Sequence, residues 1–195
     1  MMGPLASHMV MHILLMNLLA PVAAMTACGV WHQRREPVGG ALAFATAAQL
    51  FGLWIWHAPP LLTPALASVR LHLLMYGTLF LTALLYWWVV LRFRGSHSWK
   101  PILSLLVTSK LYCLLGVLFV FAPRALFTGM VSHNPAAVAP TPEAVLADQQ
   151  LAGLLMLVAC PTSYVLGGVV LGARWLFAME ADEIERPNTG EEAWT

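Results

Sequence analysis

The chain has 195 residues, of which 59% are apolar and only 10% are charged, and its formal net charge is +1. A soluble globular domain is about 45–50% apolar and about 25% charged, so this composition excludes a soluble enzyme and a disordered chain. A net charge so close to zero gives no electrostatic footprint for a polyanion, which excludes a nucleic-acid binder. We therefore predict an integral membrane protein: one small all-α helical bundle in the lipid bilayer.

Five charge-poor segments are long enough to cross a hydrocarbon core about 30 Å thick. They cover residues 8–30, 41–57, 69–91, 101–121 and 149–177. Three prolines in the segment APPLLTP predict the end of the second span. Residues 122–147 are expected to form a polar outer loop and residues 180–195 an acidic, flexible tail, so that residues 1–179 make a single domain. We expect no strands, because isolated apolar segments satisfy their backbone polar groups as helices.

The basic residues of the connections predict how the chain is oriented. One side holds seven of the ten Lys and Arg residues: Arg34, Arg35, Arg92, Arg94, Lys100, Arg174 and Arg186. The other side holds Arg70 and Arg124, while Lys110 falls inside the fourth span. Because positive residues collect on the cytoplasmic side, the N-terminus and the 122–147 loop are predicted outside and the C-terminus in the cytoplasm.

Histidines gather at the outer ends of the predicted spans. His8 and His12 lie in the opening turns of the first span, His57 closes the second, and His72 opens the third. His8, His12 and Met16 follow at intervals of four residues, which places them on one helical face. Neutral imidazole is the commonest protein ligand for a transition metal, and thioether sulfur favours Cu(I). The pattern therefore predicts a metal site near the outer surface.

Two further residues lie at the same depth, and one of them has an alternative role. Asp148 opens the fifth span, with Met156 two turns further along. Asp148 could instead cap its own helix, and a single histidine at a helix end could lie at the lipid headgroups. Lys110, a cation near mid-span, could pair with an unseen group, reach a headgroup or bind a partner subunit.

Several segments together resemble one known family. Residues 8–16 (HMVMHILLM), followed by Pro21, are similar to the HMxxHxxLM…P opening of the CtaG-type cytochrome c oxidase assembly proteins. Further elements resemble that family in the right order: WHAP at 56–59, His72, FAPR at 121–124 and DQQLAGLLM at 148–156. The resemblance covers residues 8–177. Relatives often carry spans before the first motif, so it implies a shortened member.

The resemblance implies a role in assembling haem–copper respiratory oxidases in the bacterial inner membrane, through copper delivery. It implies that copper, as Cu(I) or Cu(II), is handled on the periplasmic or exterior side by His8, His12, His57, His72, Asp148 and Met156. The expected partners are an oxidase subunit or other assembly factors, and a homo-oligomer is compatible with this role. Since no bond is made or broken, we expect a non-enzyme.

Two other functions fit the residues. Histidines on facing helices can hold haem b, and His8 or His12 with His57 or His72 would supply two axial ligands. The protein would then carry electrons. Alternatively, it is a metal-free structural subunit of a respiratory complex, and the histidines are incidental.

Overall fold

The computed structural model describes residues 2–30, 37, 39–93, 99–127 and 140–185. Every regular element in these ranges is a helix, which confirms the all-α prediction. In chain order the helices are α1 Pro4–Ile13, the π-helical turn η1 Leu14–Leu19, α2 Ala20–Val30, α3 Gly39–Trp56, α4 Pro59–Ala67, α5 Val69–Leu91, α6 Trp99–Phe121 and α7 Pro142–Glu185.

The helices are long and apolar enough to make this a multi-pass membrane protein. Four stretches of the described chain each suffice to cross a bilayer: Pro4–Cys28, Val69–Leu91, Trp99–Phe121 and Pro142–Ala181. A fifth candidate is the pair Gly40–Trp56 and Pro59–Ala67, which is bent by 73° at a short break. The five predicted spans thus correspond to helices, while the orientation of the chain stays a prediction.

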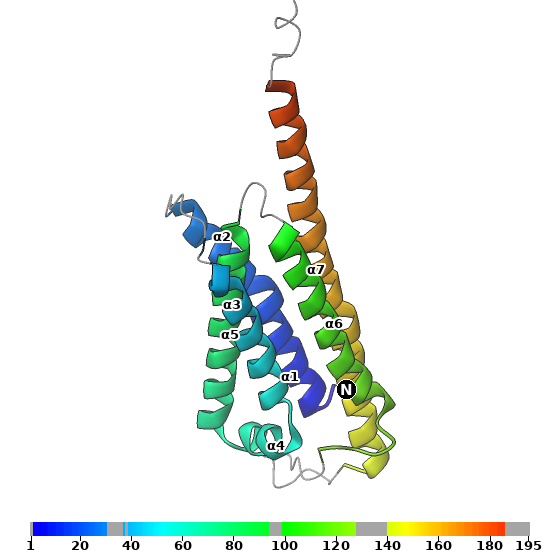
Figure 1. Ribbon diagram of the computed structural model, residues 1–195. Coiled ribbons are helices and arrows are strands. Elements are labelled where there is room, and N and C mark those ends of the chain that lie inside the picture. The colour runs from blue at the N-terminus through cyan, green and yellow to red at the C-terminus, as the bar shows by residue number, and fades with distance from the viewer. Residues whose placement is uncertain (1, 31–36, 38, 94–98, 128–139, 186–195) are drawn as a thin grey trace, which may run out of the picture.

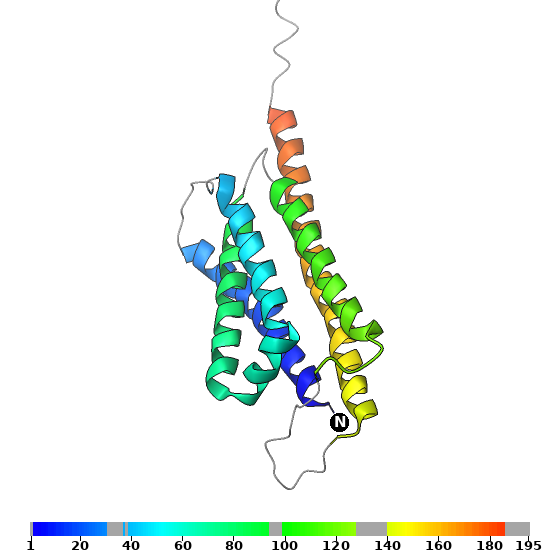
Figure 2. The same cartoon turned by 60° about the horizontal axis from the view of Figure 1, so that its bottom comes forward.

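The helices form two groups with α1 between them (Figures 1 and 2). α6 and α7 run antiparallel and pack along much of their length, whereas α2 and α3 both pack on α5. α1 contacts α7 on one side and α5 on the other. The short α4 lies at the end of the bundle where α1 begins (Figure 1). This arrangement brings the start of α1, the end of α3 and the start of α5 to one end of the bundle.

The prolines after His57 start a helix, where the sequence predicted only an end. α3 does end at Trp56, but α4 then begins with Pro59 and Pro60 in its first turn. A proline fits there because its missing N–H would have no helical acceptor and its fixed φ is already helical. The N–H groups of Leu61 and Leu62 both donate to the carbonyl of Ala58 at 3.0 Å, which closes the first turn.

The first span contains a π-helical turn at Leu14–Leu19, which begins two residues after His12 and includes Met16. Pro21 accounts for its position, since a proline inside an α-helix loses one hydrogen bond and clashes with the carbonyl four residues before it. The wider turn relieves that clash, and the N–H of Ala20 reaches the carbonyl of Leu15, five residues back.

α7 is longer at both ends than the predicted fifth span. It begins at Pro142, inside the stretch predicted as loop, and continues to Glu185, inside the predicted tail. Thr141 explains the early start, because its hydroxyl accepts a hydrogen bond from the N–H of Ala144 at 3.3 Å and thereby caps the helix. Pro142 in the first turn is also favourable.

The interior also holds polar contacts around two tyrosines that the sequence did not predict. Ser104 donates to the hydroxyl of Tyr86 at 3.1 Å, and Thr46 lies 2.8 Å from Ser104. Gln49 donates to the hydroxyl of Tyr164. Because polar groups inside a membrane bundle need partners, these contacts fix how α3, α5, α6 and α7 are placed along one another.

α6 and α7 approach most closely at two glycines. A Cβ added to Gly153 would lie 2.8 Å from the carbonyl oxygen of Gly116, and one added to Gly116 would lie 3.0 Å from the carbonyl oxygen of Gly153. Small residues at such crossings let membrane helices pack backbone to backbone.

We expect the substitution Gly153→Ala to lower the free energy of unfolding by about 1–3 kcal/mol, because the added methyl group forces the two helices apart. For a chain of this size, each kcal/mol corresponds to about 2–4 °C in Tm. Thermal unfolding in mild detergent measures the change. Gly168→Ala on the same helix is the control, since a Cβ there meets nothing within 4 Å. Equal Tm values for the two variants would contradict the prediction.

Candidate metal centre

Three buried histidines meet at the end of the bundle where α1 begins. His8 and His12 come from α1, one turn apart, and His57 lies in the bend between α3 and α4. One ligand nitrogen from each lies within 4.8 Å of the others. The ring centroids of His12 and His57 are 5.1 Å apart, and those of His8 and His12 are 5.5 Å apart. All three side chains are at most 2% exposed, so the cluster is closed off from the surroundings.

His72 in the first turns of α5 extends the cluster. Its ring centroid is 5.5 Å from that of His8, and the side chain is half-buried. It is outside the group of three whose ligand atoms lie within 4.8 Å of one another. Tyr76, one turn further along α5, stacks on His8 with the ring centroids 5.2 Å apart. The structure therefore brings together all four predicted histidines, three of them tightly.

Hydrogen bonds to neighbouring groups orient two of the imidazoles. The Nδ1 atom of His57 lies 2.7 Å from the carbonyl oxygen of Leu53. Because a carbonyl only accepts, this nitrogen carries the proton, and the lone pair is left on Nε2. The Nδ1 atom of His8 lies 3.0 Å from the hydroxyl of Tyr76. A hydrogen bond to the second ring nitrogen is the usual way in which proteins orient metal-binding histidines.

Four other nitrogens of the cluster are buried without a hydrogen-bond partner among the described residues. They are Nε2 of His8, Nδ1 of His12, Nε2 of His57 and Nε2 of His72. Buried polar atoms in folded proteins are almost always paired. Four unpaired nitrogens in one cluster leave imidazole lone pairs available to a ligand.

A transition metal ion fits this donor set. Imidazole ligands suit copper, zinc, iron and nickel. With ligand bonds of about 2.0–2.1 Å in tetrahedral geometry, two nitrogens on one ion are about 3.3–3.4 Å apart. Nitrogens that lie within 4.8 Å of one another therefore need to approach by at most about 1.5 Å. The number, type and spacing of the donors thus fit a metal ion.

Met16 and Met156 are both fully buried, Met16 in η1 and Met156 in α7. A thioether in either place is a soft ligand of the kind that favours Cu(I). Their ligation of a metal stays a prediction.

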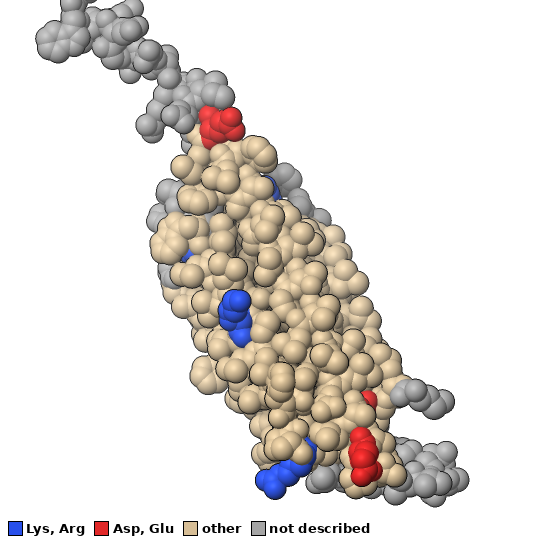
Figure 3. Space-filling view, turned by 90° about the vertical axis from the view of Figure 1, so that its right-hand side faces the viewer, with Lys and Arg blue, Asp and Glu red and all other residues tan. Residues whose placement is uncertain are grey.

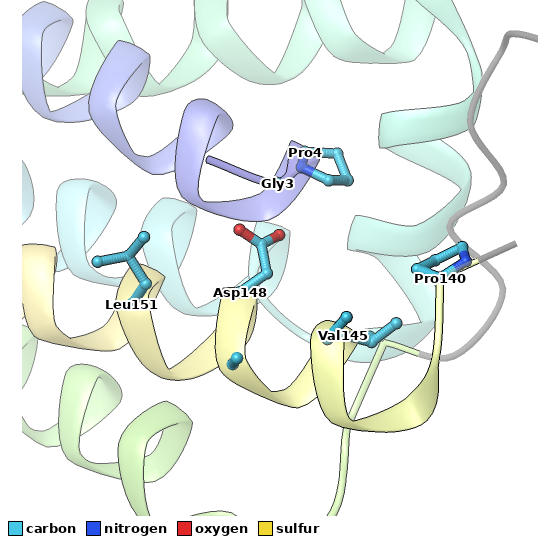
Figure 4. A pocket seen from close by; sticks show the side chains of 8 residues that line it. Gly3, Pro4, Pro140, Val145, Asp148 and Leu151 are labelled. Carbon is cyan, nitrogen blue, oxygen red and sulfur yellow. The ribbon is translucent and has the colours of Figure 1, made fainter. Parts of the chain in front are cut away.

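Asp148 holds the start of α1, a role different from the two that the sequence suggested for it. Its Oδ2 accepts a hydrogen bond from the N–H of Leu5 at 2.9 Å, and its Oδ1 one from the N–H of Ala6 at 3.3 Å. Figure 4 shows the carboxylate of α7 pointing at this helix end, beside Gly3 and Pro4. A Cβ on Gly3 would overlap the carboxylate of Asp148, so a larger residue there would displace the carboxylate from the helix end. Asp148 therefore caps α1, the helix that carries His8 and His12.

Sequence reasoning missed Tyr76 and the carbonyl of Leu53. A usable signal was present in both cases, because each lies four residues from a histidine, Tyr76 after His72 and Leu53 before His57. Residues four apart lie on one helical face. For Tyr76 the contact with His8 on another helix depends on how α1 and α5 pack, which the spacing does not reveal.

Comparison with known protein families gives a match over most of the chain. Residues 2–177, nearly the whole chain, match the family described as cytochrome c oxidase caa3 assembly factor (Caa3_CtaG). No curated protein and no solved structure matches the chain.

Proposed function

Since this chain belongs to the cytochrome c oxidase caa3 assembly factor family, we propose that it binds copper and helps metallate or assemble a haem–copper oxidase. The observation that carries the proposal is the group of three buried histidines whose ligand atoms lie within 4.8 Å of one another. Copper is cargo in this role, received at the histidine cluster and passed to an oxidase subunit or to another assembly factor. The protein makes and breaks no covalent bond of a substrate.

The residues around the cluster support reversible binding. His57 is fixed by Leu53 in the tautomer that leaves a lone pair on Nε2. His8 and His12 sit on a helix whose start is held by Asp148. A site made of neutral imidazoles without thiolates binds less permanently than a cysteine site, because the ligands exchange and also take up protons. Release to a partner then requires only ligand exchange.

The direct test is the metal content of the protein purified in mild detergent after growth with copper. We expect about one copper per chain in the natural protein and little in the double variant His8→Ala/His12→Ala. His32→Ala is the matched control, since the sequence places His32 beyond the opposite end of the same span. Equal copper in the natural protein and the double variant would remove the proposal.

An optical spectrum of the same sample separates the alternatives. Haem b held by two histidines would give a Soret band, so a colourless protein that carries copper excludes the electron-transfer alternative. A colourless protein without metal, whose histidine variants still support oxidase assembly, would favour the metal-free structural subunit.

A further inference from the structure

Lys110 lies at the middle of a membrane-spanning helix. It follows Trp99, the first residue of α6, by eleven residues and precedes Phe121, the last, by eleven. At 1.5 Å per residue its Cα is about 16 Å from either end of the helix. Its side chain is exposed on the outside of the bundle. A positively charged side chain therefore lies halfway along the span, on a surface whose other side chains are suited to face lipid.

The neighbours of Lys110 on the same face are apolar. Exposed side chains recur along α6 at the spacing of one helical face: Leu103, Leu106, Val107, Leu114 and Val117. Figure 3 shows the side of the molecule that lies on the right in Figure 1. A group of Lys or Arg atoms lies midway along it among uncharged atoms, and the other charged atoms lie mainly toward the two ends. We call these five residues together with Lys110 the Lys110 face.

This position is unfavourable in lipid alone. A lysine near a helix end extends its four-carbon stem to the headgroups, but from the middle of a span that distance is too long. Charged residues at such depth are rare and usually pair with another group. The described carboxylate side chains are Glu143, Asp148 and Glu180, which lie toward the ends of α7. None of these three forms an ion pair with Lys110.

A second copy of this chain does not supply the missing anion. Of the nine acidic residues, three are Glu36, Glu143 and Asp148, and the other six lie at or beyond Glu180. None of them falls near the middle of a span. Two Lys110 faces packed on each other would instead oppose like charges, which is repulsive. A lipid phosphate does not supply the anion either, because it lies at the membrane surface, which the Lys110 side chain does not reach from the middle of the span.

We propose that the Lys110 face is the docking surface for a transmembrane helix of a different protein, one that carries a carboxylate near the middle of the bilayer. The apolar residues of the face pack against that helix, and Lys110 pairs with the carboxylate, which fixes the depth and the rotation of the partner. Because the family assembles an oxidase, the membrane subunits of the oxidase are the proteins in which to look for it. The proposal does not depend on the copper site.

Site-specific photocrosslinking in membranes tests this surface. A photoreactive amino acid replaces Leu114, one turn from Lys110 and 46% exposed. A second variant carries it at Leu81 in the middle of α5, 61% exposed, on the other side of the bundle (Figure 1). Each is co-expressed with the oxidase subunits of the same source. We expect an adduct with an oxidase membrane subunit from position 114 and none from position 81.

The charge is tested in the background of the position-114 probe. Lys110→Met should reduce the adduct by at least about tenfold, because the partner carboxylate is left unpaired. Lys110→Arg should retain most of it. Arg124→Met is the matched control, since it removes an exposed positive charge near the end of the bundle. Thermal unfolding and copper content of each variant separate a loss of docking from a loss of fold or of the copper site.

Three results would overturn the proposal. One is an adduct from position 114 that is as strong in Lys110→Met as in the natural protein. Another is a set of adducts to lipid only, or to a second copy of this chain. The third is a failed charge swap. Once the partner carboxylate next to the probe is identified, the partner variant in which lysine replaces it should restore the adduct with Lys110→Glu. If it does not, the pairing is excluded.

Discussion

Replacing His57 by alanine is expected to lower the affinity for Cu(I) by roughly a hundredfold or more. Removing a group that only hydrogen-bonds to a metal ligand lowers metal affinity about 10–100-fold. His57→Ala removes a ligand itself. His57 is the only member of the close group of three that comes from outside α1, so its loss leaves a site on one helix. Titration against a Cu(I) chelator at pH 7.5 measures the difference.

His72→Ala is the matched comparison for His57→Ala. His72 is half-buried and lies outside the group of three, although its ring is 5.5 Å from that of His8. We expect a loss of about tenfold or less from this variant. Both variants should show cooperative thermal unfolding, which separates a loss of ligation from a loss of structure. If His72→Ala proved as damaging as His57→Ala, copper would be held by a different set of nitrogens from the one proposed.

The membrane fold and the meeting of the histidines followed from the sequence because both depend on local features. Scarcity of charge marks the spans, and each histidine lies near a helix end that the composition already indicates. His8 and His12 share a face by their spacing alone. Topology then brings His57 and His72 to the same end of the bundle, since consecutive antiparallel helices alternate direction.

The features that the sequence did not reveal depend on contacts between distant segments. Whether Pro59 ends one helix or begins another depends on where the chain turns, and the residue type allows both. Asp148 could be expected to cap a helix, but that the helix is α1, more than 140 residues earlier, follows only from the packing of α1 on α7. The pairing of Tyr76 with His8 is of the same kind.

Asp148→Ala is expected to loosen the start of α1 and with it the copper site. The carboxylate accepts hydrogen bonds from the N–H groups of Leu5 and Ala6, and hydrogen bonds to a charged group contribute about 1.5–3 kcal/mol each. His8 and His12 lie within two turns of this end. We expect Tm to fall by several °C and the affinity for Cu(I) to fall about 10–100-fold, as for other contacts that orient ligands.

Two further variants distinguish this positioning role from a general effect of charge. Glu143→Ala removes an exposed acid from the first turn of the same helix, and it should leave both Tm and copper affinity unchanged. Asp148→Asn keeps one carbonyl oxygen as an acceptor but turns an amide toward the second N–H group, so its losses should be intermediate. If Asp148→Asn abolished copper binding while Tm stayed at the natural value, the carboxylate would act as a metal ligand and not as the cap of α1. The ranking of these three variants in both measurements therefore separates a residue that holds the helix from one that holds the ion.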